Sequence, residues 1–212
     1  MGTWDFAVSN NRPIIATSFL LCGLMLARPA LVAGAEPTVP KASLNAHAKA
    51  PSIYDVEGKW TNQDGLPFNW SDKRFEWTVL SMVYTSCQSS CPLITQKMQL
   101  LEKKLPPTSS SKVRFLLFSF DSKRDFGAAL KIFAEKHHLD MSRWSLLTAS
   151  DEESRTLATA LDFRFKKLEN WEFSHSNQIT LLNAAGTIVS QTSNLADAPQ
   201  TLLAVIVGGR DK

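Results

Sequence analysis

The chain has 212 residues, of which 44% are hydrophobic and 20% charged, and its formal net charge is +3. This composition is typical of a globular protein with one domain of roughly 150 residues and additional segments. Because the basic residues form no long run, the charge pattern excludes a typical nucleic-acid-binding surface, and we expect no nucleic-acid partner.

The N-terminal segment differs in composition from the rest of the chain. Residues 14–27 form an uncharged, largely apolar run, which Arg12 precedes and the small residues Ala33-Gly34-Ala35 follow. This pattern is typical of a secretory signal peptide that is cleaved after Ala35. A retained membrane anchor through residues 13–32 is the alternative, although the run is short for a bilayer-spanning helix. In either case residues 1–35 predict an extracytoplasmic protein in the periplasm, secreted across the inner membrane or anchored in it.

A stretch rich in proline and alanine, residues 36–51, follows this leader. It contains three prolines and shows no apolar periodicity, which indicates a flexible tether. We therefore expect the folded domain to span residues 52–212.

Strand-like and helix-like patterns alternate along this domain. In chain order the predicted elements are a hairpin at 54–70 around a turn at 62–65, a strand at 77–84, a helix at 92–105, a strand at 113–120, a helix at 125–138, a strand at 144–147, a helix from a capping box at 150–153 to about 161, a hairpin at 178–190 and a helix at 199–207. The alternation predicts a layered α/β fold with a central mixed sheet flanked by helices, plus an N-terminal hairpin.

Two cysteines, Cys87 and Cys91, lie where the strand at 77–84 leads into the helix at 92–105. Unpaired backbone N–H groups and the positive end of the helix dipole favour thiolates there, and the thiolate is the reactive, metal-binding form. A spacing of four places both sulfurs on one side of a helical turn, so they can meet one ion or each other. The spacing is one residue wider than the usual Cys-x-x-Cys redox motif, which favours a metal site without excluding a disulfide.

His175 is the candidate third ligand. It precedes the strand of the second hairpin, and the entry to that strand can lie beside the strand-to-helix junction of a layered α/β fold. The residues alone leave a metal ligand and an ordinary loop histidine equally open. The other histidines lie in the tether or at a helix end, where a solvated side chain is expected: His47, His137 and His138.

Several motifs of the domain follow one another in a characteristic order. They are Tyr84-Thr85-Ser86-Cys87-x3-Cys91-Pro92-Leu93, Phe120-Asp121-x2-Arg124-Asp125, Phe173-Ser174-His175-Ser176, and Ile179-Thr180-Leu181-Leu182 followed by Gly186. In order and spacing they resemble the Sco (SenC) family of copper chaperones, over residues 52–207. The resemblance implies a thioredoxin-like fold, a membrane-anchored or periplasmic location, and one copper ion held by Cys87, Cys91 and His175. It also implies copper delivery to the CuA site of cytochrome c oxidase, or preparation of its thiols, with Asp121 as an acidic residue near the ion.

The chemistry of these residues agrees with that implication. Two thiolates and an imidazole form a soft donor set that suits Cu(I) and, with added ligands, Cu(II). Three protein ligands leave the ion open to a ligand from a copper-receiving oxidase subunit or another copper enzyme. Oxidation of Cys87 and Cys91 to a disulfide would abolish the site, so we expect dependence on a thiol reductant. We expect Asp121 to orient His175 or to attract the cation, with an ordinary strand-end carboxylate as the alternative.

Two positions depart from the pattern of the family, which usually has proline where this chain has Gln88 and Ser122. Neither departure changes a ligand, but both bear on loop rigidity and partner recognition.

The competing hypothesis is a thiol-disulfide oxidoreductase, in which Cys87 attacks and Cys91 resolves. Thioredoxin-like oxidoreductases generally have a cis-proline near the position of Asn177, and this chain has no proline there. A peroxidase of related fold would need a single peroxidatic cysteine with an arginine partner, of which the sequence shows no sharp sign. We therefore expect a metallochaperone rather than an enzyme, with thiol-disulfide reductase activity as the alternative.

Overall fold

The computed structural model describes residues 51–70 and 75–209. The predicted leader, residues 1–35, and the predicted tether up to residue 50 lie outside the described residues. No helix in the described part of the chain has both the length and the apolar character needed to cross a bilayer.

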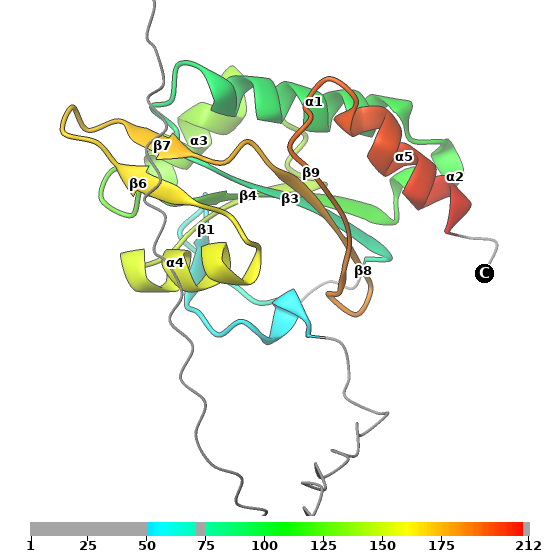
Figure 1. Ribbon diagram of the computed structural model, residues 1–212, viewed down its shortest axis with the longest axis horizontal. Coiled ribbons are helices and arrows are strands. Elements are labelled where there is room, and N and C mark those ends of the chain that lie inside the picture. The colour runs from blue at the N-terminus through cyan, green and yellow to red at the C-terminus, as the bar shows by residue number, and fades with distance from the viewer. Residues whose placement is uncertain (1–50, 71–74, 210–212) are drawn as a thin grey trace, which may run out of the picture. The chain divides into compact units, whose positions relative to one another are not determined.

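The described residues fold into alternating strands and helices (Figure 1). The strands are β1 (Trp60–Asn62), β2 (Pro67–Phe68), β3 (Trp77–Val83), β4 (Val113–Ser119), β5 (Trp144–Thr148), β6 (Phe165–Lys167), β7 (Phe173–His175), β8 (Ile179–Asn183) and β9 (Ile188–Thr192). The helices are the 3-10 helix η1 (Ile53–Asp55) and the α-helices α1 (Ser90–Lys104), α2 (Pro107–Ser110), α3 (Gly127–Lys136), α4 (Asp151–Ala160) and α5 (Ala198–Gly208).

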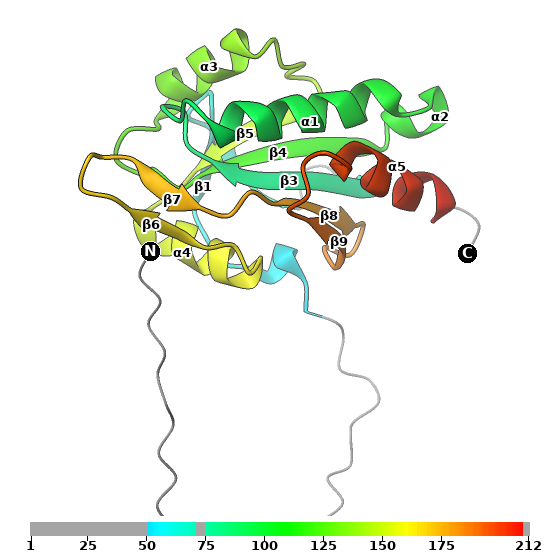
Figure 2. The same ribbon diagram turned by 45° about the horizontal axis from the view of Figure 1, so that its top comes forward.

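A seven-stranded mixed sheet forms the centre of the domain, in the order β2-β1-β5-β4-β3-β8-β9. Its middle strands β3, β4 and β5 are parallel, and β1, β8 and β9 pair with their neighbours in antiparallel fashion. Helices α1, α3 and α5 cover one face of the sheet and α4 lies against the other (Figure 2). The fold is the predicted thioredoxin-like one, with helices on both sides of a mixed sheet.

The central strands are buried along nearly their whole length and are mostly apolar, because both of their faces are covered. In β3 every residue from Thr78 to Val83 is buried, and in β4 every residue is. Phe115 of β4 stacks on Trp144 of β5, with ring centroids 4.8 Å apart. Burial of each large side chain of this kind contributes about 1.5–3 kcal/mol, so these strands form the stable base on which the loops rest.

Several local features differ from the sequence expectations, among them the short helix α2, which was not predicted. The N-terminal hairpin is shorter than predicted, since residues 53–55 form η1 and only β1 and β2 pair. Helix α1 begins at Ser90 rather than at Pro92, which places Cys91 inside its first turn. The β6–β7 hairpin was not predicted at all, and it forms a separate two-stranded sheet.

The parallel register brings two loops together at one edge of the sheet. Val83, the last residue of β3, is aligned with Ser119, the last residue of β4. The loops that follow these strands therefore leave the sheet side by side. The β6–β7 hairpin lies at the same edge, near the beginning of α1 (Figures 1 and 2).

Candidate metal centre

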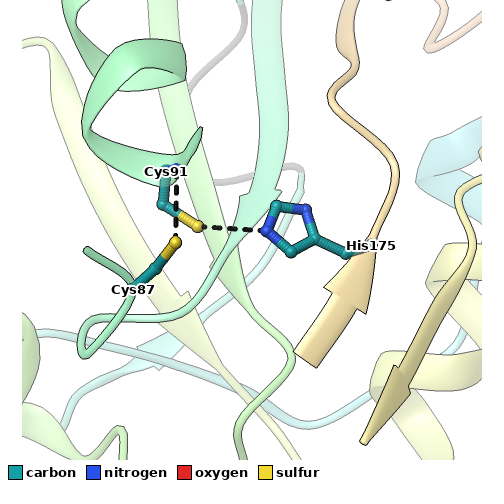
Figure 3. Close-up of side chains that lie close together, drawn as sticks. All are labelled: Cys87, Cys91 and His175. Atoms are coloured by element: carbon teal, nitrogen blue, oxygen red, sulfur yellow. Dashed lines mark hydrogen bonds between the residues drawn. The ribbon is translucent and has the colours of Figure 1, made fainter. Parts of the chain in front are cut away.

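Cys87, Cys91 and His175 converge at the junction of β3 and α1 (Figure 3). One ligand atom of each residue lies within 4.8 Å of the other two. The Sγ atom of Cys91 is 3.7 Å from Nε2 of His175. With metal–ligand bonds of about 2.0–2.3 Å, this separation corresponds to an ion that joins the two atoms at an angle of about 120°. The arrangement therefore has the dimensions of a site for a single ion.

The start of α1 positions the two sulfurs. The N–H group of Cys87 donates to the carbonyl oxygen of Tyr84 at 3.3 Å, which closes a tight turn after β3. The N–H group of Cys91 lies 3.5 Å from Sγ of Cys87 and donates to it. The Ser89 side chain makes no capping bond, so the Cys87 sulfur serves as acceptor for an N–H group that the helix leaves unpaired. Both cysteines are buried, and no disulfide joins them.

The pKa values of the two cysteines are shifted in opposite directions. Burial alone raises the pKa of Cys87, but hydrogen bonds, chiefly from the backbone N–H groups of Cys91 and Ser89, lower it to about 6. Burial raises the pKa of Cys91 well above its usual range, and the nearby charge of Cys87 raises it further. At neutral pH the pair therefore consists of one thiolate, Cys87, and one thiol, Cys91.

The ring of His175 is held in one orientation and one tautomer. Its Nδ1 atom lies 2.8 Å from the carbonyl oxygen of Ser176. A carbonyl only accepts, so Nδ1 carries the proton and Nε2 presents its lone pair to the cysteines. The ring also packs against three aromatic side chains, with centroid distances of 5.8 Å to Tyr84, 5.3 Å to Phe120 and 6.1 Å to Phe163. This is the support that a histidine ligand of a metal ion requires.

Residues 49–208 match the model of the SCO1/SenC family. The chain belongs to this family. A SCO1 protein homolog of Bacillus subtilis (strain 168) is 27% identical to this Sco chain over 155 residues, which are 71% of this chain and 80% of the relative. Solved structures of Sco proteins have the same fold as this chain.

Two of these structures illustrate the likeness. BsSco, described as a member of the Sco family of cytochrome c oxidase assembly proteins with a disulfide switch, is 25% identical with a TM-score of 0.64, covering 76% of this chain and 95% of its own. The Arabidopsis thaliana ScoI structure, which has copper bound, is 20% identical with a TM-score of 0.62, covering 70% of this chain and 95% of its own.

Asp121, which the sequence predicts to lie near the ion, is not part of the group of three ligand atoms. Its carboxylate pairs with Arg124, and Nη2 of Arg124 donates to the carbonyl oxygen of Trp171 at 2.8 Å. Among the described residues no hydrogen bond joins Asp121 to His175. The contact between them is indirect, because Trp171 lies in the turn of the hairpin that carries His175. Whether Asp121 acts on the ion stays a prediction.

A second carboxylate, Asp125, contacts the cysteine loop, and sequence reasoning missed it. Its side chain is fully buried. Oδ2 accepts hydrogen bonds from the Thr85 N–H group at 2.8 Å and the Ser119 hydroxyl at 2.6 Å, while Oδ1 accepts from the Thr85 hydroxyl at 2.5 Å. Burial raises the pKa of Asp125 and these hydrogen bonds oppose the rise. Its position in the loop after β4, next to the loop after β3, was the signal that could have revealed it.

This Sco site can act in two ways. Its soft donors, two sulfurs and one imidazole, can hold a thiophilic ion such as copper. Alternatively, the two sulfurs can close into a disulfide, which requires them to approach to about 2.05 Å. The two outcomes exclude each other, because a disulfide leaves no thiolate for the ion.

Proposed function

We propose that this Sco chain is a copper metallochaperone that holds one copper ion, Cu(I) or Cu(II), through Cys87, Cys91 and His175. The observation that carries the proposal is the convergence of three soft donor atoms within 4.8 Å of one another. The fixed tautomer of His175 supports it, since the unprotonated Nε2 faces the sulfur of Cys91. The copper-bound ScoI relative supports the choice of metal.

We further propose that the copper is cargo and that the recipient is the copper-receiving subunit of a cytochrome oxidase, at its CuA site. Three protein ligands leave one side of a copper ion open, so a ligand of the recipient can enter before a ligand of this chain leaves. Family membership and the description of BsSco as an oxidase assembly protein support this recipient. Another copper enzyme is the alternative recipient.

The second candidate function is thiol-disulfide exchange with the thiols of the recipient. The acid strengths favour it, because Cys87 is a thiolate at neutral pH and Cys91 remains a thiol, as an attacking and a resolving cysteine require. Oxidation of this thiolate–thiol pair to a disulfide releases two electrons and one proton, so a thiol reductant must restore it. The proximity of His175 to Cys91 and the trans peptide bonds throughout the described residues count against a dedicated oxidoreductase.

Anaerobic titration of the reduced protein with Cu(I), against a competing chelator, tests the proposal. We expect one tightly bound ion per chain, and a His175→Ala variant that binds at least about tenfold more weakly, because even outer contacts of a ligand change metal affinity about 10–100-fold. His138→Ala is the matched control, since this histidine lies outside the group of three.

Wild-type affinity in His175→Ala would refute the three-ligand site. Weak binding by the wild-type protein, unaffected by His175, would favour the redox function and make the reduction potential of the cysteine pair the next measurement.

We also propose that residues 1–35 direct export or anchor the protein and that residues 36–51 form a tether to the domain at 52–212. The apolar run at 14–27 supports this assignment. Mass spectrometry of the exported protein should find Glu36 as the first residue if the leader is cleaved, or Met1 in the membrane fraction if it is an anchor. An uncleaved chain in the cytosolic fraction would contradict both.

A further inference from the structure

The hydroxyl of Ser90 contacts the same nitrogen that faces the cysteines. Ser90 is the first residue of α1, and its Oγ lies 3.1 Å from Nε2 of His175. The carbonyl of Ser176 fixes the proton of the imidazole on Nδ1. Because Nε2 then has only a lone pair to offer, the hydroxyl donates and Nε2 accepts.

An ion at the site needs that same lone pair. Nε2 has one lone pair. In the metal-free protein this lone pair can accept from the Ser90 hydroxyl at 3.1 Å or from the Cys91 thiol at 3.7 Å, and in the loaded protein it binds the metal. Binding of an ion to His175 must therefore break the hydrogen bond to Ser90. The reverse step restores it: as the bond between Nε2 and the ion breaks, the O–H···N bond forms, with no proton transferred and no change of oxidation state.

The imidazole does not depend on Ser90 for its orientation. The Ser176 carbonyl holds Nδ1 on the opposite side of the ring, and the rings of Tyr84, Phe120 and Phe163 pack around it. Ser90 itself is not the N-cap of α1, and alanine is a good helix former at its position. Loss of the hydroxyl should therefore remove the shorter of the two hydrogen bonds to Nε2 while the ring and the helix stay in place.

We propose that Ser90 is a positioning residue for copper release, whose hydroxyl competes with the ion for Nε2 of His175. The inference rests on the proposed function, in which this histidine is a copper ligand. In the transfer that this inference implies, His175 dissociates from the ion first, and its Nε2 then accepts the hydrogen bond from Ser90. The ion then remains on the two cysteine sulfurs, which leaves the side vacated by the imidazole open to a ligand of the recipient.

The test is the Cu(I) affinity of the reduced protein and its Ser90→Ala variant, measured anaerobically against a chelator, together with the rate of copper transfer to that chelator. A neutral hydrogen bond contributes about 0.5–1.5 kcal/mol net. At 1.4 kcal/mol per factor of ten, we expect Ser90→Ala to bind copper about 2- to 10-fold more tightly and to release it more slowly. Ser90→Thr keeps the hydroxyl and should stay within about twofold of wild type.

The ¹⁵N NMR spectrum of the metal-free protein gives a readout that a purely structural role would not move. The Nε2 resonance of His175 should shift in Ser90→Ala and return in Ser90→Thr, while the Nδ1–H signal stays unchanged. Unchanged or weaker copper binding by Ser90→Ala, with tight binding by wild type, would overturn this inference alone. Failure of the wild-type protein to bind copper would overturn the proposed function and the inference with it.

Discussion

The buried carboxylate of Asp125 should control both the stability of the domain and the order of the cysteine loop. In Asp125→Ala, three donors lose their acceptor: the N–H group and the hydroxyl of Thr85, and the hydroxyl of Ser119. A buried donor left without a partner costs about 1–3 kcal/mol. The N–H group of Thr85 cannot turn away, whereas the two hydroxyls can rotate and regain part of the loss. We therefore expect the free energy of unfolding to fall by about 2–4 kcal/mol.

Asp125→Asn is the matched control, because the amide has the same shape. Its oxygen can accept from the Thr85 N–H group and from Ser119, and its nitrogen can donate to a rotated Thr85 hydroxyl. The expected loss is about 1 kcal/mol, the difference between a charged and a neutral hydrogen-bonding group.

Guanidinium chloride denaturation of the reduced, metal-free protein measures these differences. Because Thr85 stands two residues before Cys87, the alanine variant should also bind Cu(I) more weakly than the asparagine variant. An alanine variant within 1 kcal/mol of wild type, with wild-type copper affinity, would refute the role assigned to Asp125. The same measurements on Asp121→Ala compare it with the carboxylate that the sequence singled out.

Two other predictions concern the thiols and the turn before β9. Between pH 7 and pH 9 the Cu(I) affinity should rise about tenfold per pH unit, because binding displaces the proton of Cys91 while Cys87, whose pKa is about 6, is already a thiolate. Below about pH 6 the slope should steepen as Cys87 also takes up a proton, and an affinity independent of pH above 7 would contradict the assignment. Gly186→Ala should lower the free energy of unfolding by about 2–4 kcal/mol, because φ is +78° and the new Cβ would overlap Ser52 and lie 2.6 Å from Cγ of Tyr54. Gly65→Ala, at φ +74° but in open space, should cost only the backbone part, about 1–2 kcal/mol, and equal thermal shifts in the two variants would exclude the clash.

The central strands could be predicted because buried strands have a recognisable sequence pattern, a run of mostly apolar and β-branched residues. Both faces of β3 and β4 are covered, so nearly every residue is apolar or β-branched, and the predicted strands exceed the observed ones by a single residue at the C-terminal end. The capping box at Ser150 was equally readable, because the serine and Glu153 bond each other's backbone within four residues of chain. A local interaction of this kind can be predicted without knowing the tertiary fold.

The hairpin that carries His175 has no sequence pattern that predicts it. Its strands β6 and β7 have three residues each, and Trp171 in its turn takes φ +66° without being glycine. The contacts that stabilise it are distant in sequence, such as the bond from Arg124 to the Trp171 carbonyl. The sequence therefore left His175 open between ligand and loop residue, and its distance from Cys91 favours the ligand.

The two carboxylates show the same limit. Asp121 and Asp125 both follow β4, and nothing in their local sequence says which one contacts the cysteine loop. The answer depends on the parallel alignment of Val83 with Ser119. In this alignment Asp125 accepts a hydrogen bond from Thr85, whereas Asp121 pairs with Arg124.

The wide separation of the donors along the chain has a consequence for biogenesis. Cys91 and His175 are 84 residues apart, so the imidazole leaves the ribosome after both thiols have done so. In that interval the third ligand is missing, and any oxidant that reaches the two cysteines can join them in a disulfide. An ion that later joins both segments closes a long loop of chain, which restricts the unfolded ensemble as a cross-link does. Under the proposed function, copper loading therefore follows the synthesis of the hairpin, and the bound ion would join the hairpin to helix α1.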